Sequence, residues 1–487
     1  MAERSFVNTK GKEENETAVC KIKLLTGNDR RISMNNTEEL RAERNQIFHD
    51  VFDNKIPKRV PIKVNLGLEV IAGYAGIDGK EAIWHPELLE KAADELCSMV
   101  PSDVCMYGGT IRMPIAYQAL DSNNFKMNRA GLMQHPNTVG LLPEEYDEFI
   151  ENPYDCIIEK VLPRNYSGLD FKNNPGRSMM ALYQGLASKD RFMMKNGAMM
   201  GKLIQKYGLY GMSPVFTSMC YAPLDILTDN MRSLSDMCMD IRRRPDKVLD
   251  AVNAVYALNY KAGLPKQISN YGHVFFPLHL ATYMKEKDFV KLWWEPFLRQ
   301  ATDYASLGLH INAFCEHDWM RYLDYLYELP TDTYLSFEMG DAKLVKEKLG
   351  NKHIISGLFP LALLRTGTKQ ECIDQVKEFL DIMMPGGKFI FGFDKGALTY
   401  NDINLENLIA VCETVRDYGV YQNPGGQAGL QFHKEDYVHS ELPPFESKYY
   451  RSWEQYLEMN PYTPESAKET VMDLEDEILR YVYLLCE

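Results

Sequence analysis

Short apolar runs alternate with longer amphipathic stretches along most of the chain, a pattern typical of buried strands followed by covering helices. The expected strands are 59–67, 103–109, 211–219, 271–279, 309–315, 333–338, 353–357 and 388–392. The expected helices are 86–99, 143–151, 194–206, 245–261, 285–306, 320–329, 341–349, 370–383 and 404–418. About eight strand–helix units over roughly 360 residues predict an α/β fold and favour a (β/α)8 TIM barrel over an open sheet. No GxGxxG follows the first expected strand, which speaks against a dinucleotide-binding fold.

The same pattern divides the chain into three parts. Residues 1–38 are polar with little periodicity and predict a loosely docked arm. The barrel is expected over 39–420, introduced by a helix that Thr37 caps. Residues 421–487 form a loop-rich aromatic tail ending in an amphipathic helix, with Thr463 as cap and Pro464 in its first turn. This helix must pack on the barrel or on a second copy of the chain, so a homodimer is one expected assembly.

Composition narrows the range of partners and compartments. The formal charge is −14, from 54 basic and 68 acidic residues, and no long basic run is present, which speaks against a nucleic-acid partner. The 10 cysteines contain no CxxC pair, a pattern that predicts free thiols and a cytoplasmic protein. No window approaches the roughly 18 consecutive apolar residues of a membrane span.

The candidate chemistry is concentrated at the ends of the expected strands. Residues 308–319 contain a short apolar run that includes His310 and ends in Cys315, Glu316, His317 and Asp318. Such a run is typical of a parallel strand that opens onto an active-site face. A carboxylate there is desolvated unless it is paired or metal-bound.

We therefore expect a metal site formed by three side chains, each of which also has an alternative structural role. The expected ligands are His279, Glu316 and Glu338, and the alternatives are strand-end ion pairs for the glutamates and a core histidine for His279. His317 and Asp394 are further candidates. His310 lies early in its strand, where a buried structural role is expected, and Cys315 should face away from the barrel interior by strand alternation.

Four other residues near strand ends are candidates for contact with a substrate. Asp225 either orients the substrate or caps the following helix. Tyr74 and Tyr107 either bind substrate or pack as ordinary aromatic residues, and Asn65 closes the first expected strand.

Several motifs in order resemble the uroporphyrinogen decarboxylase-like superfamily over about residues 40–420. These motifs are APLD at 222–225, DIRRRP at 240–245, FPLH at 276–279, EHDW at 316–319, LDYLYELP at 323–330, FE at 337–338, AKLVKEKLG at 342–350, ISG at 355–357, LLRTG at 363–367 and PGGKFI at 385–390. The decarboxylase's arginine-rich loop after the first strand has no counterpart, because Asn65-Leu-Gly-Leu-Glu69 stands in its place. The resemblance therefore implies the corrinoid-dependent methyltransferase branch, with cobalamin carried by a partner corrinoid protein.

The resemblance also implies whether the chain takes the methyl group from a donor or delivers it to an acceptor. Thiol-methylating relatives bind zinc through a His-x-Cys and a later Cys, whereas the matching positions here are Phe314 or His310, Glu316, and Asp394 or Lys395. Harder ligands leave zinc a stronger Lewis acid, which favours polarising an ether over activating a thiol. The expected activity is O-demethylation of an aromatic methyl ether, with Glu316, His317 and Asp225 as catalytic residues.

Other functions remain open from the sequence. One is zinc-dependent transfer of methyl from methylcobalamin to a thiol or a folate-type acceptor. Another small methyl or chloromethyl donor, a decarboxylase-like activity, and a non-catalytic scaffold for the corrinoid protein are the remaining alternatives.

Overall fold

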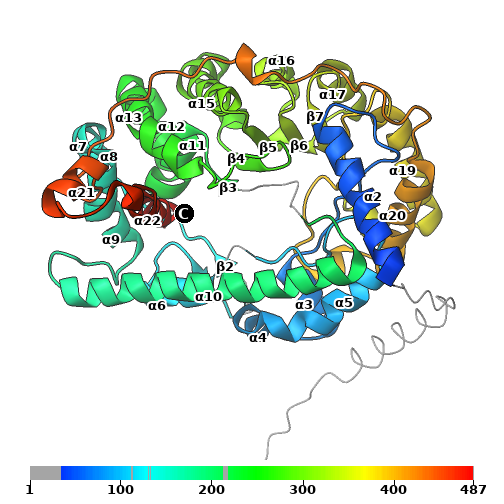
Figure 1. Ribbon diagram of the computed structural model, residues 1–487, viewed down its shortest axis with the longest axis horizontal. Helices are drawn as coiled ribbons and strands as arrows, with labels where there is room; N and C mark the ends of the chain where they lie inside the picture. Colours follow the sequence, from blue (N-terminus) through cyan, green and yellow to red (C-terminus); the bar gives the residue numbers. More distant parts are fainter. Residues whose placement is uncertain (1–33, 111–112, 130, 132, 212–217, 486–487) are drawn as a thin grey trace, which may run out of the picture.

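A computed structural model describes residues 34–110, 113–129, 131, 133–211 and 218–485. Most of the expected polar arm thus lies outside the described residues. Helices form the outer layer, and strands β3–β7 lie side by side on the inner side of α13, α15, α16 and α17 (Figure 1). The protein is therefore an α/β fold with an inner parallel sheet.

The sheet has five parallel strands in the order β3-β4-β5-β6-β7. Their bounds are Ser218–Met219, His273–Leu278, His310–Asp318, Tyr334–Met339 and Ile354–Gly357. The predictions for β4 to β7 are confirmed within a few residues. Only the last part of the strand expected at 211–219 is described, as β3, because 212–217 lie outside the described residues.

Parallel hydrogen bonds continue beyond β7 through three segments that are not continuous strands. Ile390 N donates to Ile355 O at 3.1 Å, Lys63 N to Phe391 O at 2.9 Å, and Leu66 N to Met106 O at 2.7 Å. The strands expected at 59–67, 103–109 and 388–392 are thus reduced to isolated bridges. One cause is Pro61, which has no N–H to donate to a ladder.

The helices that cover the sheet agree with the predicted periodicity. They are α13 Pro245–Gly263, α15 Glu295–Ser306, α16 Leu323–Glu328, α17 Ala342–Leu349, α19 Lys369–Met383 and α20 Leu405–Tyr418. The other helices are α3 Leu68–Ala75, α4 Gly79–Trp84, α5 Glu90–Met99, α6 Pro114–Ala119, α7 Tyr146–Glu151, α8 Pro153–Cys156, α9 Leu162–Asn165, α11 Pro223–Leu227, α12 Leu234–Arg243, α14 Glu286–Asp288, α18 Leu363–Thr366 and α21 Trp453–Met459. A two-stranded hairpin pairs β1 Lys126–Met127 with β2 Met133–Gln134.

Three helices differ from their predicted starts. α10 runs from Pro175 to Tyr207, far longer than the expected 194–206, and lies along the lower side of the molecule (Figure 1). α2 spans Met34–Phe52, so Thr37 lies inside the helix and does not cap it. The last helix, α22, spans Lys468–Leu484, and Pro464 precedes a short 3₁₀ turn before it.

The terminal helix packs on its own chain. Tyr483 Oη donates to Asn259 Oδ1 of α13 at 2.7 Å, and Lys261 pairs with Asp476 at 2.8 Å. The terminal helix thus has a packing partner within its own chain, in α13. Within the described ranges, no helix is long and apolar enough to cross a membrane.

A buried charged cluster at the amino-terminal end of the sheet links Asn54, Asp332 and Lys388, which lie far apart in the sequence. The Lys388 side chain is fully buried; its ammonium pairs with Asp332 and donates to Asn54 Oδ1. Asn54 in turn donates its amide to the second Asp332 oxygen at 2.6 Å. Lys388 and Asp332 are each other's counter-charge. Replacing either one therefore leaves the other charge buried without its partner.

Candidate functional site

The site is centred on His279, the first residue beyond the carboxyl end of β4. Its Nδ1 donates to Asp229 Oδ2 at 2.6 Å, and its Nε2 donates to Glu316 Oε1 at 3.2 Å. Glu316 lies near the end of β5, and Asp229 lies in the π-helical turn η4 Thr228–Arg232 that follows α11. Two neighbouring strands and one helical turn thus hold one imidazole between two carboxylates.

This arrangement favours the charged form of the imidazole. Burial lowers the pKa of His279, but hydrogen bonds to Asp229 and Glu316 and the charges of Asp229 and Asp225 raise it more, to about 11. The ring is therefore protonated at neutral pH. Its side chain keeps 32% exposure, so a bound molecule can contact the ring beside its two hydrogen bonds.

Asp225 holds the backbone of the turn that carries His279. It is fully buried and accepts the backbone N–H groups of His279 at 3.1 Å and Leu280 at 3.2 Å. The indole N–H of Trp293 donates to it at 2.8 Å. Burial raises the pKa of Asp225 to about 7. The structure therefore places this expected catalytic residue as a support for the His279 backbone, with its three partners all from the protein.

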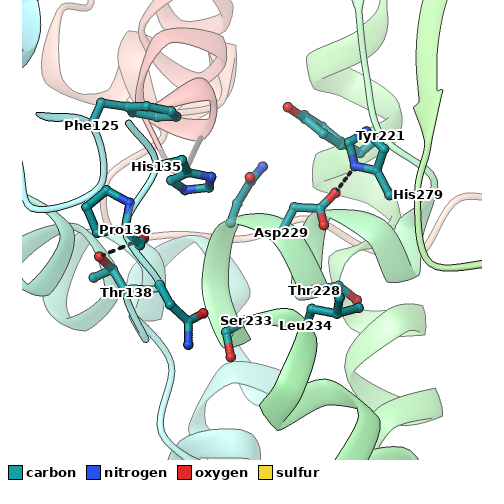
Figure 2. Close-up of a pocket in the computed structure, with 12 residues that line it drawn as sticks. Phe125, His135, Pro136, Thr138, Tyr221, Thr228, Asp229, Ser233, Leu234 and His279 are labelled. Atoms are coloured by element: carbon teal, nitrogen blue, oxygen red, sulfur yellow. Dashed lines mark hydrogen bonds and ion pairs between the residues drawn. The ribbon is translucent and has the colours of Figure 1, made fainter. Parts of the chain in front are cut away.

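A cavity of about 300 Å³ opens beside this histidine. Figure 2 shows Phe125, His135, Pro136 and Thr138 on one side, facing Asp229 and His279 on the other. The rings of Phe125 and His135 are stacked at 4.6 Å and form a flat wall. The cavity is at the small end of the range for ligand pockets and suits a single-ring molecule.

Asn230 gives this cavity a specific polar group. Asn230 lines it with only 5% of its surface exposed. Its Nδ2 has no hydrogen-bond partner within the described ranges. A buried amide without an acceptor costs about 1–3 kcal/mol, so an acceptor oxygen on a bound molecule would relieve that cost.

The remaining residues expected at the strand ends make other contacts. Glu338 accepts from His317 N at 2.9 Å and lies 4.0 Å from Lys395 Nζ. The His317 ring contacts Tyr283 Oη at 2.9 Å, and its backbone is left-handed. Asp394 accepts from Leu361 N at 2.9 Å, and burial raises its pKa. These residues form a second polar group beside β6, apart from the cavity lining.

His310 occupies the buried position that the sequence predicts, and Cys315 of the same strand is buried as well. His310 is buried and hydrogen-bonds Asn270 at 2.8 Å, and burial lowers its pKa to about 4. Cys315 is fully buried, and burial raises the pKa of its thiol.

The substrate contacts expected near the ends of the first two predicted strands do not line this cavity. Tyr74 Oη donates to Glu95 at 3.2 Å, and Tyr107 Oη donates to Asn196 of α10. Asn65 is exposed and packs beside Gly108. Both tyrosine hydroxyls thus bond to side chains of the protein itself.

Sequence reasoning missed Asp229 and Asn230. Asp229 follows Asp225 at a spacing of four residues, which on a helix places both carboxylates on one face beside the strand ends. That spacing was the available signal. No comparable pattern marks Asn230.

The donor atoms fit zinc in part. The separation of 3.2 Å between His279 Nε2 and Glu316 Oε1 matches two ligands about 2.0–2.2 Å from one tetrahedral ion. Asp229 on Nδ1 then orients the ring, as carboxylates beside metal-bound histidines commonly do. The described residues contain no group of three His, Cys, Asp or Glu side chains that would hold a metal, because Asp229 and Glu316 flank opposite sides of the ring.

The charged histidine predicts a pH-dependent stability. Because the folded pKa of His279 is raised from 6.5 to about 11, its contribution is fully present below pH 6.5 and is lost as pH rises toward 11. We expect the free energy of unfolding of wild type to exceed that of His279→Gln by more at pH 6 than at pH 10, measured by urea denaturation. An equal gap at both pH values would contradict the ion pairing.

A scan of the chain against protein-family models finds no match, and a search of curated proteins finds no similar sequence.

Proposed function

We propose that the chain is a methyltransferase that moves the methyl group of an aromatic methyl ether to the cob(I)alamin of a partner corrinoid protein. The observation that carries the proposal is the position of His279, held between Asp229 and Glu316 at the wall of a single-ring cavity. The motif order described above supports the same class.

The reaction needs an acid that fits its leaving group. When cobalt attacks the methyl carbon, the methyl–oxygen bond breaks and its electron pair stays on oxygen. A phenol has a pKa near 10, within about one unit of the value of about 11 for the imidazolium, so His279 can stabilise the developing phenolate by a strong hydrogen bond and by proton donation. An aliphatic alkoxide is far more basic and forms much less readily, which favours aryl ethers as donors.

Asp229 and Asp225 keep this acid in place. Asp229 holds Nδ1 and fixes the ring orientation, while Asp225 holds the backbone of the turn that carries His279. Phe125 and His135 offer a flat wall against which a ring can stack.

The proposal also covers the closure of the sheet, the cellular location and the assembly of the protein. The parallel bridges of 389–393, 62–66 and 103–107 support closure of the sheet into a (β/α)8 barrel, whose active sites lie at the carboxyl ends of the strands. The described cysteines are free, which supports a cytoplasmic location. A homodimer remains part of the proposal.

Zinc is the proposed metal for an alternative state of the site, in which deprotonated His279 Nε2 and Glu316 Oε1 would hold the ion in place of the His279 proton. When bound, it supplies Lewis-acid stabilisation of the leaving oxygen. If the site works in this zinc-bound state, protein purified without added zinc should contain about one zinc per chain. Glu316→Gln should lose most of it, while Glu435→Gln, on an exposed tail residue, should retain it. Metal analysis that finds no zinc in wild type would contradict this assignment.

Asn230 should set affinity for the methyl donor. Replacing Asn230 with leucine removes the amide donor while keeping a similar volume. We expect KM for an ortho-oxygenated methoxyarene to rise about tenfold, with kcat within threefold, because one hydrogen bond is worth about 1 kcal/mol or more. An unchanged KM in steady-state kinetics would remove Asn230 from the donor site.

A comparison of donors tests the proposed function. Reduced corrinoid protein is incubated with the enzyme and with methoxybenzene derivatives or matched methyl cyclohexyl ethers, and the change from cob(I)alamin to methylcobalamin is followed by absorbance. The aryl ethers should react and the alkyl ethers should not. Failure of every aryl donor would refute O-demethylation.

A further inference from the structure

A second cavity, of about 500 Å³, lies at the opposite end of the sheet from His279. α2, the last turn of α10 and the residues just before β4 form its walls. β4 spans six residues, about 20 Å at the usual strand rise, and separates this cavity from the first. The residues that matter most are Arg41, His49, Ile204, Leu209, Tyr210 and Tyr271.

Apolar and aromatic groups make most of this wall. The His49 and Tyr271 rings stack at 3.7 Å, and the Tyr210 ring stacks on Phe48 at 4.3 Å. Burial lowers the pKa of His49, so this ring is neutral at pH 7. The wall is firmly held, because Tyr210 N donates to Asp103 O at 2.8 Å and Tyr271 Oη donates to Asp53 at 3.3 Å.

Two buried polar atoms at this wall lack partners within the described residues. Tyr210 is 3% exposed, and its hydroxyl has no hydrogen-bond partner there. The buried Arg41 Nε also has none, and its Nη2 donates only to a neutral acceptor, Gln205 O, at 3.3 Å. Burial raises the pKa of Tyr210, so its hydroxyl keeps its proton as a donor.

We propose that this cavity binds a small organic acid, with the carboxylate on Arg41 Nε and Tyr210 Oη and an apolar or aromatic body against His49, Tyr271 and Ile204. A guanidinium and a hydroxyl supply the charge-assisted hydrogen bonds that a carboxylate requires. The rest of the lining is mostly apolar, with the amides of Asn45 and Gln205 as its other polar side chains, which favours an apolar body. This site is independent of the chemistry proposed at His279.

The experiment measures binding of 3-phenylpropanoate to the full chain by titration calorimetry, with 3-phenylpropanamide as the neutral probe. Wild type should bind the acid at one saturable site and bind the amide at least tenfold more weakly. Arg41→Gln should weaken binding of the acid about tenfold or more, and Tyr210→Phe about three- to tenfold. Lys343→Gln, which removes an exposed charge on α17, should change it by less than twofold.

Two further variants and a fold check separate the outcomes. His279→Gln should leave binding of the acid within twofold, because that residue lies at the other end of β4. Circular dichroism verifies that Arg41→Gln, Tyr210→Phe and His279→Gln remain folded under the conditions of the titration. Absence of saturable binding in wild type, equal affinity for acid and amide, loss of binding in His279→Gln, or unchanged affinity in both folded variants would each overturn the proposal.

Discussion

Replacing His279 with glutamine should lower the rate of methyl transfer by about 10²–10⁴-fold, the usual contribution of a general acid. Glutamine keeps a hydrogen-bonding side chain but carries no transferable proton. The loss is also expected to depend on the donor. Ethers with more acidic phenols need less protonation, so the variant should lose less activity with them. Single-turnover kinetics with reduced corrinoid protein measure both effects.

The matched control for this prediction is His433→Gln, which changes an exposed histidine of the tail. It should retain the wild-type rate. If His279→Gln keeps more than a third of the wild-type rate with an unactivated methoxyarene, His279 is not the acid.

Replacing Lys388 with methionine should lower the free energy of unfolding by about 3–5 kcal/mol, since it leaves Asp332 buried without its cation. Methionine keeps a similar length and apolar stem, so the loss of charge dominates. Urea denaturation followed by circular dichroism measures the change.

The double variant Lys388→Met with Asp332→Leu separates charge from packing. If the unpaired carboxylate causes the loss, the double variant should recover much of the stability. A double variant less stable than Lys388→Met would show that packing around Asn54 and Lys388 dominates instead.

The inner strands of the second half were predictable because each is a short apolar run bounded by polar residues. The first-half strands were harder. Pro61 interrupts the ladder, so the run at 59–67 pairs only through isolated bridges. Most of the run at 211–219 lies outside the described residues.

Helix α10 was under-predicted because glycines weaken its helical signal. Tertiary packing explains one of them. At Gly185 a Cβ would lie 2.8 Å from Tyr481 Oη of α22 and 3.1 Å from a Leu120 side-chain carbon, so the close approach needs a residue without a side chain. Such a contact joins parts of the chain almost 300 residues apart, so the local periodicity of the sequence cannot predict it.

The candidate site was predictable only in part. His279 and Glu316 follow directly from the polar ends of β4 and β5, and the structure brings them into contact. Glu338 ends the next strand but turns to the His317 backbone, since β-bulge geometry shifts the register between Cys315 and Asp318. Asp229 and Asn230 come from a helical turn, where no strand-end rule applies.

The most direct test of the proposed methyl transfer follows the methyl group itself. A 2-methoxyphenol labelled with ¹³C in its methyl group is incubated with the enzyme and reduced corrinoid protein, and the label is located by NMR. The account predicts that the label moves to cobalt and that an equal amount of catechol forms, with little transfer by His279→Gln. Label that stays in the ether, with active reduced corrinoid protein present, would contradict it.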